Sequence, residues 1–193
     1  MAVHCERIFY FAPGGSRYSI ILGVAISGNG SRIGIVCGID QQRFLLLESF
    51  GNDGDFKVIY HEFLETGFRR PVRVLFIDED QRVVFERMGG IGCYNIRSRN
   101  GIFIPLDGEI AAIDELGGRG FFFIVTSHSR YENRLVGIRF PPERLLGLFR
   151  TSTQDTVFLK APFNSPDVFL GRTESKLIIG GGTALISFNL EEN

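Results

Sequence analysis

The sequence predicts an all-β fold in which one unit of several short strands repeats along the chain. Its 193 residues include 24 glycines and 19 phenylalanines but no tryptophan, a composition typical of apolar strands joined by tight turns. One phrase recurs four times: a turn, a basic residue, a short apolar strand and a second apolar strand. The basic residues are Arg32, Arg82, Arg119 and Lys176, at intervals of 37 to 57 residues.

The length of this repeat predicts the blades of a β-propeller, since repeats of about 40 to 50 residues with several strands each are typical of that architecture. We expect a single domain over residues 1–193 with about four blades. The blades either close into a small ring or form part of a larger propeller. A β-barrel or a β-sandwich is the alternative all-β fold.

The chain begins with a predicted strand pair, residues 7–12 and 18–22, around the turn sequence Pro-Gly-Gly-Ser-Arg. In many propellers an N-terminal strand completes the last blade, which removes two free sheet edges. Because the last predicted blade stops early, we expect residues 18–22 to be this closing strand. A left-over strand at 7–12 also fits a chain that lacks upstream blades or pairs with a second copy.

The first two predicted blades cover residues 24–64 and 72–107. Turns such as Gly-Asn-Gly-Ser and Asp-Glu-Asp-Gln separate their apolar strands. The expected strands are 24–27, 33–38, 43–48 and 56–63 in the first blade, and 72–77, 82–88, 92–97 and 102–106 in the second.

The third and fourth predicted blades cover residues 110–150 and 156–190. Pro141 and Pro142 cannot continue a strand ladder and therefore mark a connection. The expected strands are 110–114, 121–127, 134–140 and 145–150 in the third blade, and 156–160, 168–171, 176–180 and 184–190 in the fourth.

The charge and the cysteine content of the chain indicate which partners and which cellular compartment are expected. The 21 basic and 22 acidic residues are interspersed and give a net charge of −1, which argues against a nucleic-acid partner. No apolar run reaches the roughly 18 residues that a membrane-spanning helix needs, so membrane insertion is not expected. Cys5, Cys37 and Cys93 are odd in number and lack metal-site spacing, which favours a reducing, cytoplasmic compartment.

The sequence offers no recognisable catalytic, metal or cofactor motif. His61-Glu62 lacks the second histidine of a zinc-peptidase motif. Ser127 and His128 are neighbours on a predicted strand and therefore point to opposite faces. The glycines at 180–182 lack the following lysine of a phosphate-binding loop. We therefore predict no catalytic residue, no metal ligand and no cofactor.

Two short stretches combine arginines with an aromatic residue. Arginine and aromatic side chains are enriched at the centres of protein interfaces, so these stretches are candidates for binding an acidic loop of a partner protein. The alternative is that they are solvated surface arginines. The candidate binding residues are Phe68, Arg69, Arg70, Tyr94, Arg97 and Arg99.

Two segments, VAISGNGSRIGIVCGIDQQRFLLLE from Val24 and FIDEDQRVVFERMGGIGCYNI from Phe76, each place a polar turn between short apolar strands. They resemble the repeats of WD40-like and YVTN-like β-propellers. The resemblance implies a rigid disc whose faces and central channel bind other proteins, or in some families a small ligand. The Trp-Asp and Gly-His dipeptides of the WD40 family are missing, so no functional residue is carried over.

Three functions follow as hypotheses. The first is a non-catalytic scaffold for protein–protein interaction, with an unidentified protein as partner. The second is a small-molecule-binding barrel or sandwich. The third is an enzyme with its site in the propeller channel, although the predicted inner strands begin with mainly apolar residues.

Overall fold

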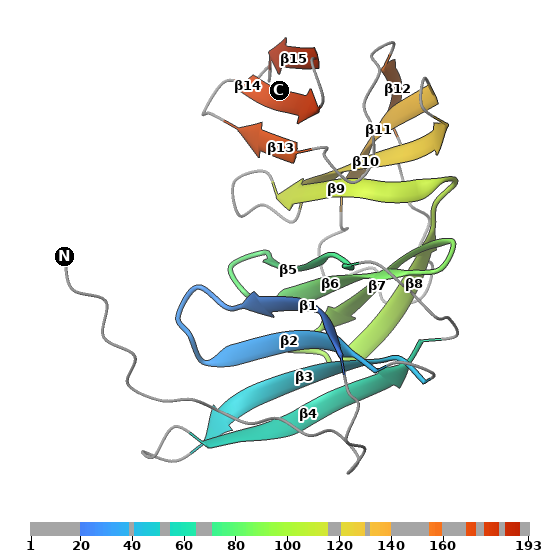
Figure 1. The fold of residues 1–193 in the computed structure, drawn as a ribbon. Helices are drawn as coiled ribbons and strands as arrows, with labels where there is room; N and C mark the ends of the chain where they lie inside the picture. Colours follow the sequence, from blue (N-terminus) through green and yellow to red (C-terminus); the bar gives the residue numbers. More distant parts are fainter. Residues whose placement is uncertain are drawn as a thin grey trace, which may run out of the picture.

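The computed structural model describes fifteen β-strands in four antiparallel sheets, and it contains no helix in the described residues (Figure 1). No described segment is therefore a helix long and apolar enough to cross a bilayer. The described residues are 20–38, 41–50, 55–64, 71–115, 121–129, 132–139, 155–159, 169–172, 176–181 and 184–189.

Each sheet is formed by strands that follow one another in the chain. Sheet A contains β1 (Ile21–Ile26), β2 (Arg32–Cys37), β3 (Arg43–Phe50) and β4 (Asp55–Phe63). Sheet B contains β5 (Val74–Ile77), β6 (Arg82–Arg87), β7 (Gly90–Asn95) and β8 (Asn100–Pro105). Sheet C contains β9 (Glu109–Glu115), β10 (Phe121–Ser129), β11 (Glu132–Arg139) and β12 (Asp155–Leu159). Sheet D contains β13 (Phe169–Arg172), β14 (Lys176–Gly181) and β15 (Ala184–Asn189).

The four sheets stack in chain order, with sheets A and D at opposite ends of the stack (Figure 1). The first strand of each sheet contacts the first strand of the next: β1 contacts β5, β5 contacts β9, and β9 contacts β13. This arrangement of meandering sheets around a row of first strands is that of propeller blades.

The first strands of sheets A and B approach closely enough to share a backbone hydrogen bond. The amide of Val72 donates to the carbonyl oxygen of Leu22 over 2.9 Å. A Cβ atom on Gly23 would lie 2.4 Å from the carbonyl oxygen of Val72, so a side chain at position 23 would push the two strands apart.

Apolar side chains fill the space between sheets A and B. Phe44 of sheet A and Phe85 of sheet B are buried, and their rings stack at a centroid distance of 3.9 Å. The members of this core are Val36, Phe44, Leu46, Leu64, Val72, Phe76, Val83, Phe85 and Tyr94. A second core joins sheets B and C through Ile77, Val84, Ile91, Cys93, Ile104, Leu106, Ile110 and Val136.

The predicted closing strand at 18–22 is wrong for the part that the structure describes. Ile21 and Leu22 lie in β1, and Ile21 is paired with Cys37 of β2. The apolar run continues through Gly23 with a register shift between Ile21 and Gly23. A break at this glycine, between the predicted strands 18–22 and 24–27, therefore does not occur. Residues 7–12 lie outside the described residues.

The predicted boundary between the third and fourth blades is also wrong. The strand β12 pairs with β11, with Thr156 opposite Val136, and is therefore the outer strand of sheet C. The prediction had assigned that place to residues 145–150, which lie outside the described residues. Two apolar runs close together in sequence compete for one pairing partner, and only the tertiary structure decides between them.

Candidate functional site

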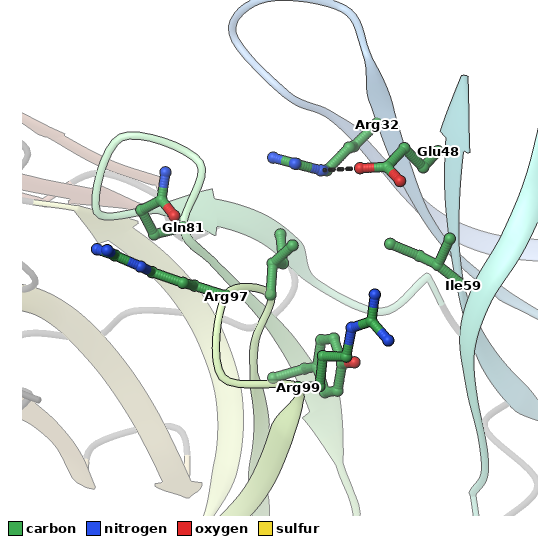
Figure 2. A pocket seen from close by; sticks show the side chains of 8 residues that line it. Arg32, Glu48, Ile59, Gln81, Arg97 and Arg99 are labelled. Carbon is green, nitrogen blue, oxygen red and sulfur yellow. Dashed lines mark hydrogen bonds and ion pairs between the residues drawn. The ribbon is translucent and has the colours of Figure 1, made fainter. Parts of the chain in front are cut away.

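A pocket of about 580 Å³ lies between sheets A and B (Figure 2). Its walls combine arginine side chains with apolar and aromatic ones. Sheet A contributes Arg32, Glu48 and Ile59; the β5–β6 turn contributes Gln81; and β7 with the turn after it contributes Tyr94, Ile96, Arg97 and Arg99.

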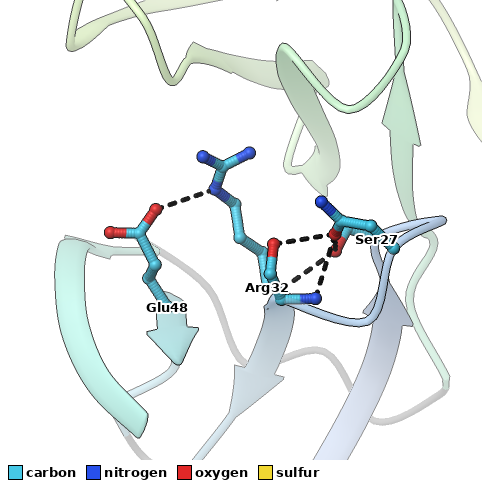
Figure 3. Close-up of polar contacts among 5 residues, drawn as sticks. Ser27, Arg32 and Glu48 are labelled. Carbon is cyan, nitrogen blue, oxygen red and sulfur yellow. Dashed lines mark hydrogen bonds and ion pairs between the residues drawn. The ribbon is translucent and has the colours of Figure 1, made fainter. Parts of the chain in front are cut away.

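The turn before β2 fixes the position of Arg32 (Figure 3). The Oδ1 atom of Asn29 accepts hydrogen bonds from the Ser27 hydroxyl at 2.9 Å, the Ser31 amide at 3.0 Å and the Ser31 hydroxyl at 2.7 Å. The Ser27 hydroxyl oxygen accepts a hydrogen bond from the Arg32 amide at 2.9 Å. Side-chain oxygens that bind nearby amides in this way stabilise tight turns, so β2 begins at a defined residue.

Glu48 holds the side chain of Arg32. The two residues are opposite each other in the β2–β3 register, and the Arg32 Nε atom donates to Glu48 Oε1 over 3.1 Å. The side chains are 22% and 33% exposed, so water screens the pair only in part. The bond uses Nε alone, and the guanidinium group extends into the space between the sheets (Figure 2). Its two terminal nitrogens therefore remain available to a ligand.

The turn between β7 and β8 presents Arg97 and Arg99. Asn95 Oδ1 accepts a hydrogen bond from the Ser98 amide at 2.9 Å, and Arg99 has a left-handed φ of 56°. A non-glycine residue with positive φ is uncommon outside tight turns. Both arginine side chains are exposed, so the turn holds two cationic groups at the edge of the pocket.

Tyr94 contributes a buried ring to the lining of the same pocket. It is 4% exposed, and its ring stacks on that of Tyr60 from sheet A at 3.9 Å with an interplanar angle of 19°. Burial raises the pKa of Tyr94, while the nearby Arg99 acts in the opposite direction. The phenol is therefore protonated at neutral pH.

A polar chain behind the pocket holds Tyr60 in place. The Tyr60 hydroxyl donates to Glu62 Oε2 over 2.7 Å, and Glu62 Oε1 forms an ion pair with Arg87. Burial is the main cause that raises the pKa of Tyr60, and the hydrogen bond to Glu62 adds to it. The stacked tyrosines are thus supported from the sheet A side by a fixed hydrogen-bond acceptor.

The pocket has the electrostatics of an anion site. Three guanidinium groups and one carboxylate line it, so cationic side chains outnumber anionic ones around a partly enclosed space. Such a concave cationic surface concentrates anions. No group of three or more histidine, cysteine, aspartate or glutamate side chains suited to a metal ion occurs in the described ranges.

The structure brings half of the predicted site residues together. Tyr94, Arg97 and Arg99 line the same pocket. The other three predicted residues, at 68–70, lie outside the described residues.

Five lining residues were missed: Arg32, Glu48, Ile59, Gln81 and Ile96. A signal for the first two existed, because Arg32 opens a repeated strand and the antiparallel pairing of that strand with the next one places Glu48 opposite it. No comparable signal pointed to Gln81, because a glutamine within an acidic turn is an ordinary surface residue.

The protein is of the propeller class. It has four successive antiparallel sheets that contact one another along their first strands, with a pocket between two of them. The chain belongs to the family described as "beta-propeller protein", whose model matches residues 1–193.

The comparisons also identify one curated relative and several solved structures. An uncharacterized protein of Treponema pallidum (strain Nichols) is 34% identical over 124 residues, which cover 64% of this chain and 32% of that protein. The AfRom2 CNH domain has a TM-score of 0.56 at 11% identity, covering 91% of this chain and 53% of that one. A putative 6-phosphogluconolactonase from Bacteroides uniformis has a TM-score of 0.57 at 10% identity, covering 94% and 54%. These two likenesses show the fold alone.

The chain spans about a third of the length of the curated relative and about half of the length of the two solved structures. Its matched region therefore corresponds to only a part of each.

Proposed function

We propose that the chain is a non-catalytic scaffold that binds an acidic segment of a partner protein in the pocket between sheets A and B. The observation that carries this proposal is the meeting of exposed arginines from the β7–β8 turn with Arg32 from the neighbouring sheet. The propeller fold supports it as a rigid frame, but a fold alone does not define a function.

The residue types of the pocket suit protein recognition. Arginine, tyrosine and other aromatics are enriched where protein partners bind most strongly. The ion pair with Glu48 holds the Arg32 side chain before a partner arrives, and the hydrogen bond from the Ser98 amide to Asn95 stabilises the turn that carries Arg97 and Arg99. Less side-chain entropy is then lost on binding.

The lining residues favour binding over catalysis. Covalent or general-base catalysis needs a nucleophile within hydrogen-bond reach of a base. Among the eight lining residues, the one carboxylate, Glu48, already accepts a bond from Arg32. Arginine guanidinium groups and a protonated tyrosine hydroxyl can donate hydrogen bonds to an anionic ligand. They do not supply a general base or a nucleophile.

Affinity capture with matched variants tests this proposal. The wild-type chain, Arg99→Glu and Arg43→Glu would each be used as bait in an extract of the source cells. Both substitutions change the charge by the same amount, but Arg43 lies at the other end of β3 from Glu48, over the ring of Phe63. Urea unfolding would establish that all three baits are folded.

We expect the wild type and Arg43→Glu to retain the same protein and Arg99→Glu to lose it. The loss should be at least about tenfold, because a charged hydrogen bond contributes about 1.5–3 kcal/mol. If all three baits retain the same proteins, or the wild type retains none, the proposal is wrong.

A further inference from the structure

The charge and layout of the pocket indicate the class of group that it binds: we propose that it takes a phosphate monoester dianion. This inference deepens the proposed function and rests on the same site. It specifies which acidic group a partner would insert between sheets A and B.

The first argument is charge. The lining carries three guanidinium groups and one carboxylate, so cationic groups outnumber anionic ones. A phosphate monoester carries about −1.5 to −2 charges at pH 7, whereas the carboxylate of an aspartate or glutamate side chain carries one. The phosphate is therefore attracted more strongly by a lining in which guanidinium groups predominate.

The second argument is the position of the donors. Arg32 comes from sheet A, and Arg99 comes from the β7–β8 turn on the opposite wall (Figure 2). Within the described part of the chain, Arg99 has no ion-pair partner, and the terminal nitrogens of Arg32 have no hydrogen bond. A phosphate group has three terminal oxygens that point in different directions, so it can accept bonds from both walls at once.

Glu48 has a positioning role in this site. It occupies Arg32 Nε, which directs the remaining N–H groups of that guanidinium toward the pocket. Its charge is already compensated by Arg32, so it repels an incoming anion less than a free carboxylate would.

The size of the pocket leaves room for the group that carries the phosphate. A volume of about 580 Å³ is in the range of small-molecule sites, about 300–1,000 Å³. The carrier is either a phosphorylated side chain of a partner protein or a small phosphorylated metabolite. Both present the same phosphate monoester to the arginines.

A binding titration with inorganic phosphate tests the site directly. Amide NMR shifts would be followed in the wild type, Arg32→Gln, Arg99→Gln and the control Arg43→Gln, with acetate at matched ionic strength as the comparison anion. We expect saturable shifts of residues around the pocket with phosphate in the wild type and in Arg43→Gln. Binding should weaken by about tenfold or more in each pocket variant, since each loses charge-assisted hydrogen bonds.

A Glu48→Gln variant separates positioning from direct contact. It keeps a side-chain oxygen that can accept from Arg32 Nε, it leaves the guanidinium charge in place and it removes a negative charge from the lining, so its affinity for phosphate should not fall as far as that of Arg32→Gln. Equal binding of phosphate and acetate, or wild-type affinity in both arginine variants, would overturn the inference.

The source of the phosphate is resolved by phosphatase treatment of the extract before affinity capture. Phosphate binding together with capture that phosphatase abolishes supports the inference and the proposed function. Phosphate and glucose 6-phosphate binding with no captured protein supports the inference and overturns the proposed function. Arginine-dependent capture in a chain that binds no phosphate overturns the inference alone.

Discussion

Arg32 and Arg82 occupy equivalent places in sheets A and B but make different contacts. Each opens the second strand of its sheet. Arg32 is held by Glu48 across the hairpin and faces the pocket, whereas Arg82 is 9% exposed and forms an ion pair with Asp78 in the preceding turn. The repeated basic residue was visible in the sequence. Its role was not, because that depends on which acidic residue lies within reach.

Cys93 allows a test of burial through pH. Burial is the main cause that raises the pKa of this thiol to about 12, from an ordinary value of 9.0. Above about pH 9 the unfolded chain loses this proton while the folded chain keeps it. The free energy of unfolding should therefore fall as pH rises between these values, by at most about 1.4 kcal/mol per pH unit.

The measurement is urea unfolding at several pH values between about 7 and about 10.5. Cys93→Ala removes the titrating group, so its stability should decline less steeply above about pH 9 than that of the wild type. Equal slopes in the two proteins would show that the thiol is not protected from ionisation.

Gly92 allows a test of the contact between β7 and the stacked rings. A Cβ atom at this position would lie 2.4 Å from Phe85 Cζ, and Phe85 is buried against Phe44. Gly92→Ala should therefore destabilise the protein by about 1–3 kcal/mol, as overpacking does. The control is Gly171→Ala, since no atom lies within 4 Å of a Cβ built there. Chemical denaturation of both variants gives the comparison, and equal midpoints would contradict the close contact.

At the scale of elements, the residues typical of tight turns allowed the strands of sheets A and B to be predicted from the sequence. Gly-Asn-Gly-Ser directly before β2 and Ser-Arg-Asn-Gly at the start of β8 contain the residues that tight turns need. The pairing of strands was harder to predict. A strand was expected at 156–160, but its pairing with β11 could not be inferred, because the residues of an apolar strand do not specify which strand lies next to it.

The turn before β2 provides the matching experiment. Asn29→Ala removes the acceptor of three hydrogen bonds to Ser27 and Ser31, and should cost about 1–2 kcal/mol. Asn29→Asp keeps a side-chain oxygen in the same place, so it should retain most of the stability. Thermal unfolding of the three proteins measures the difference. A loss as large in the aspartate variant as in the alanine variant would show that Asn29 acts by something other than its oxygen.

At the scale of the whole molecule, the class of fold could be predicted from the sequence. The assignment of strands to individual blades could be predicted only in part. The periodic return of turn, basic residue and two strands identified a propeller of about four blades. The described part of the expected closing strand at 18–22 lies in sheet A instead, because Ile21 pairs with Cys37 of β2 and the strand continues through Gly23. Strand pairing is made through the backbone and therefore has no side-chain signature.

The exposed edge of sheet A leads to a prediction about solution behaviour. Ile21, Val24 and Ile26 of β1 are 55%, 57% and 64% exposed, and apolar surface of this kind promotes association. The double variant Val24→Lys and Ile26→Lys should lower the concentration-dependent increase of light scattering. Its urea midpoint should stay close to that of the wild type, because little burial is lost. Unchanged scattering would show that this edge does not drive association.

The order of strands within the sheets also has a consequence for how the chain folds. Every described sheet is made of strands adjacent in sequence, and the first strand of each sheet contacts the first strand of the next along the row of β1, β5, β9 and β13. Loops that close over short stretches lose little entropy, and local pairing is fast. Sheet A can therefore form on the ribosome as soon as β4 emerges, before the residues of sheet C are synthesised. Folding would then proceed from the N-terminal sheet onward, with each finished sheet as the template for the next.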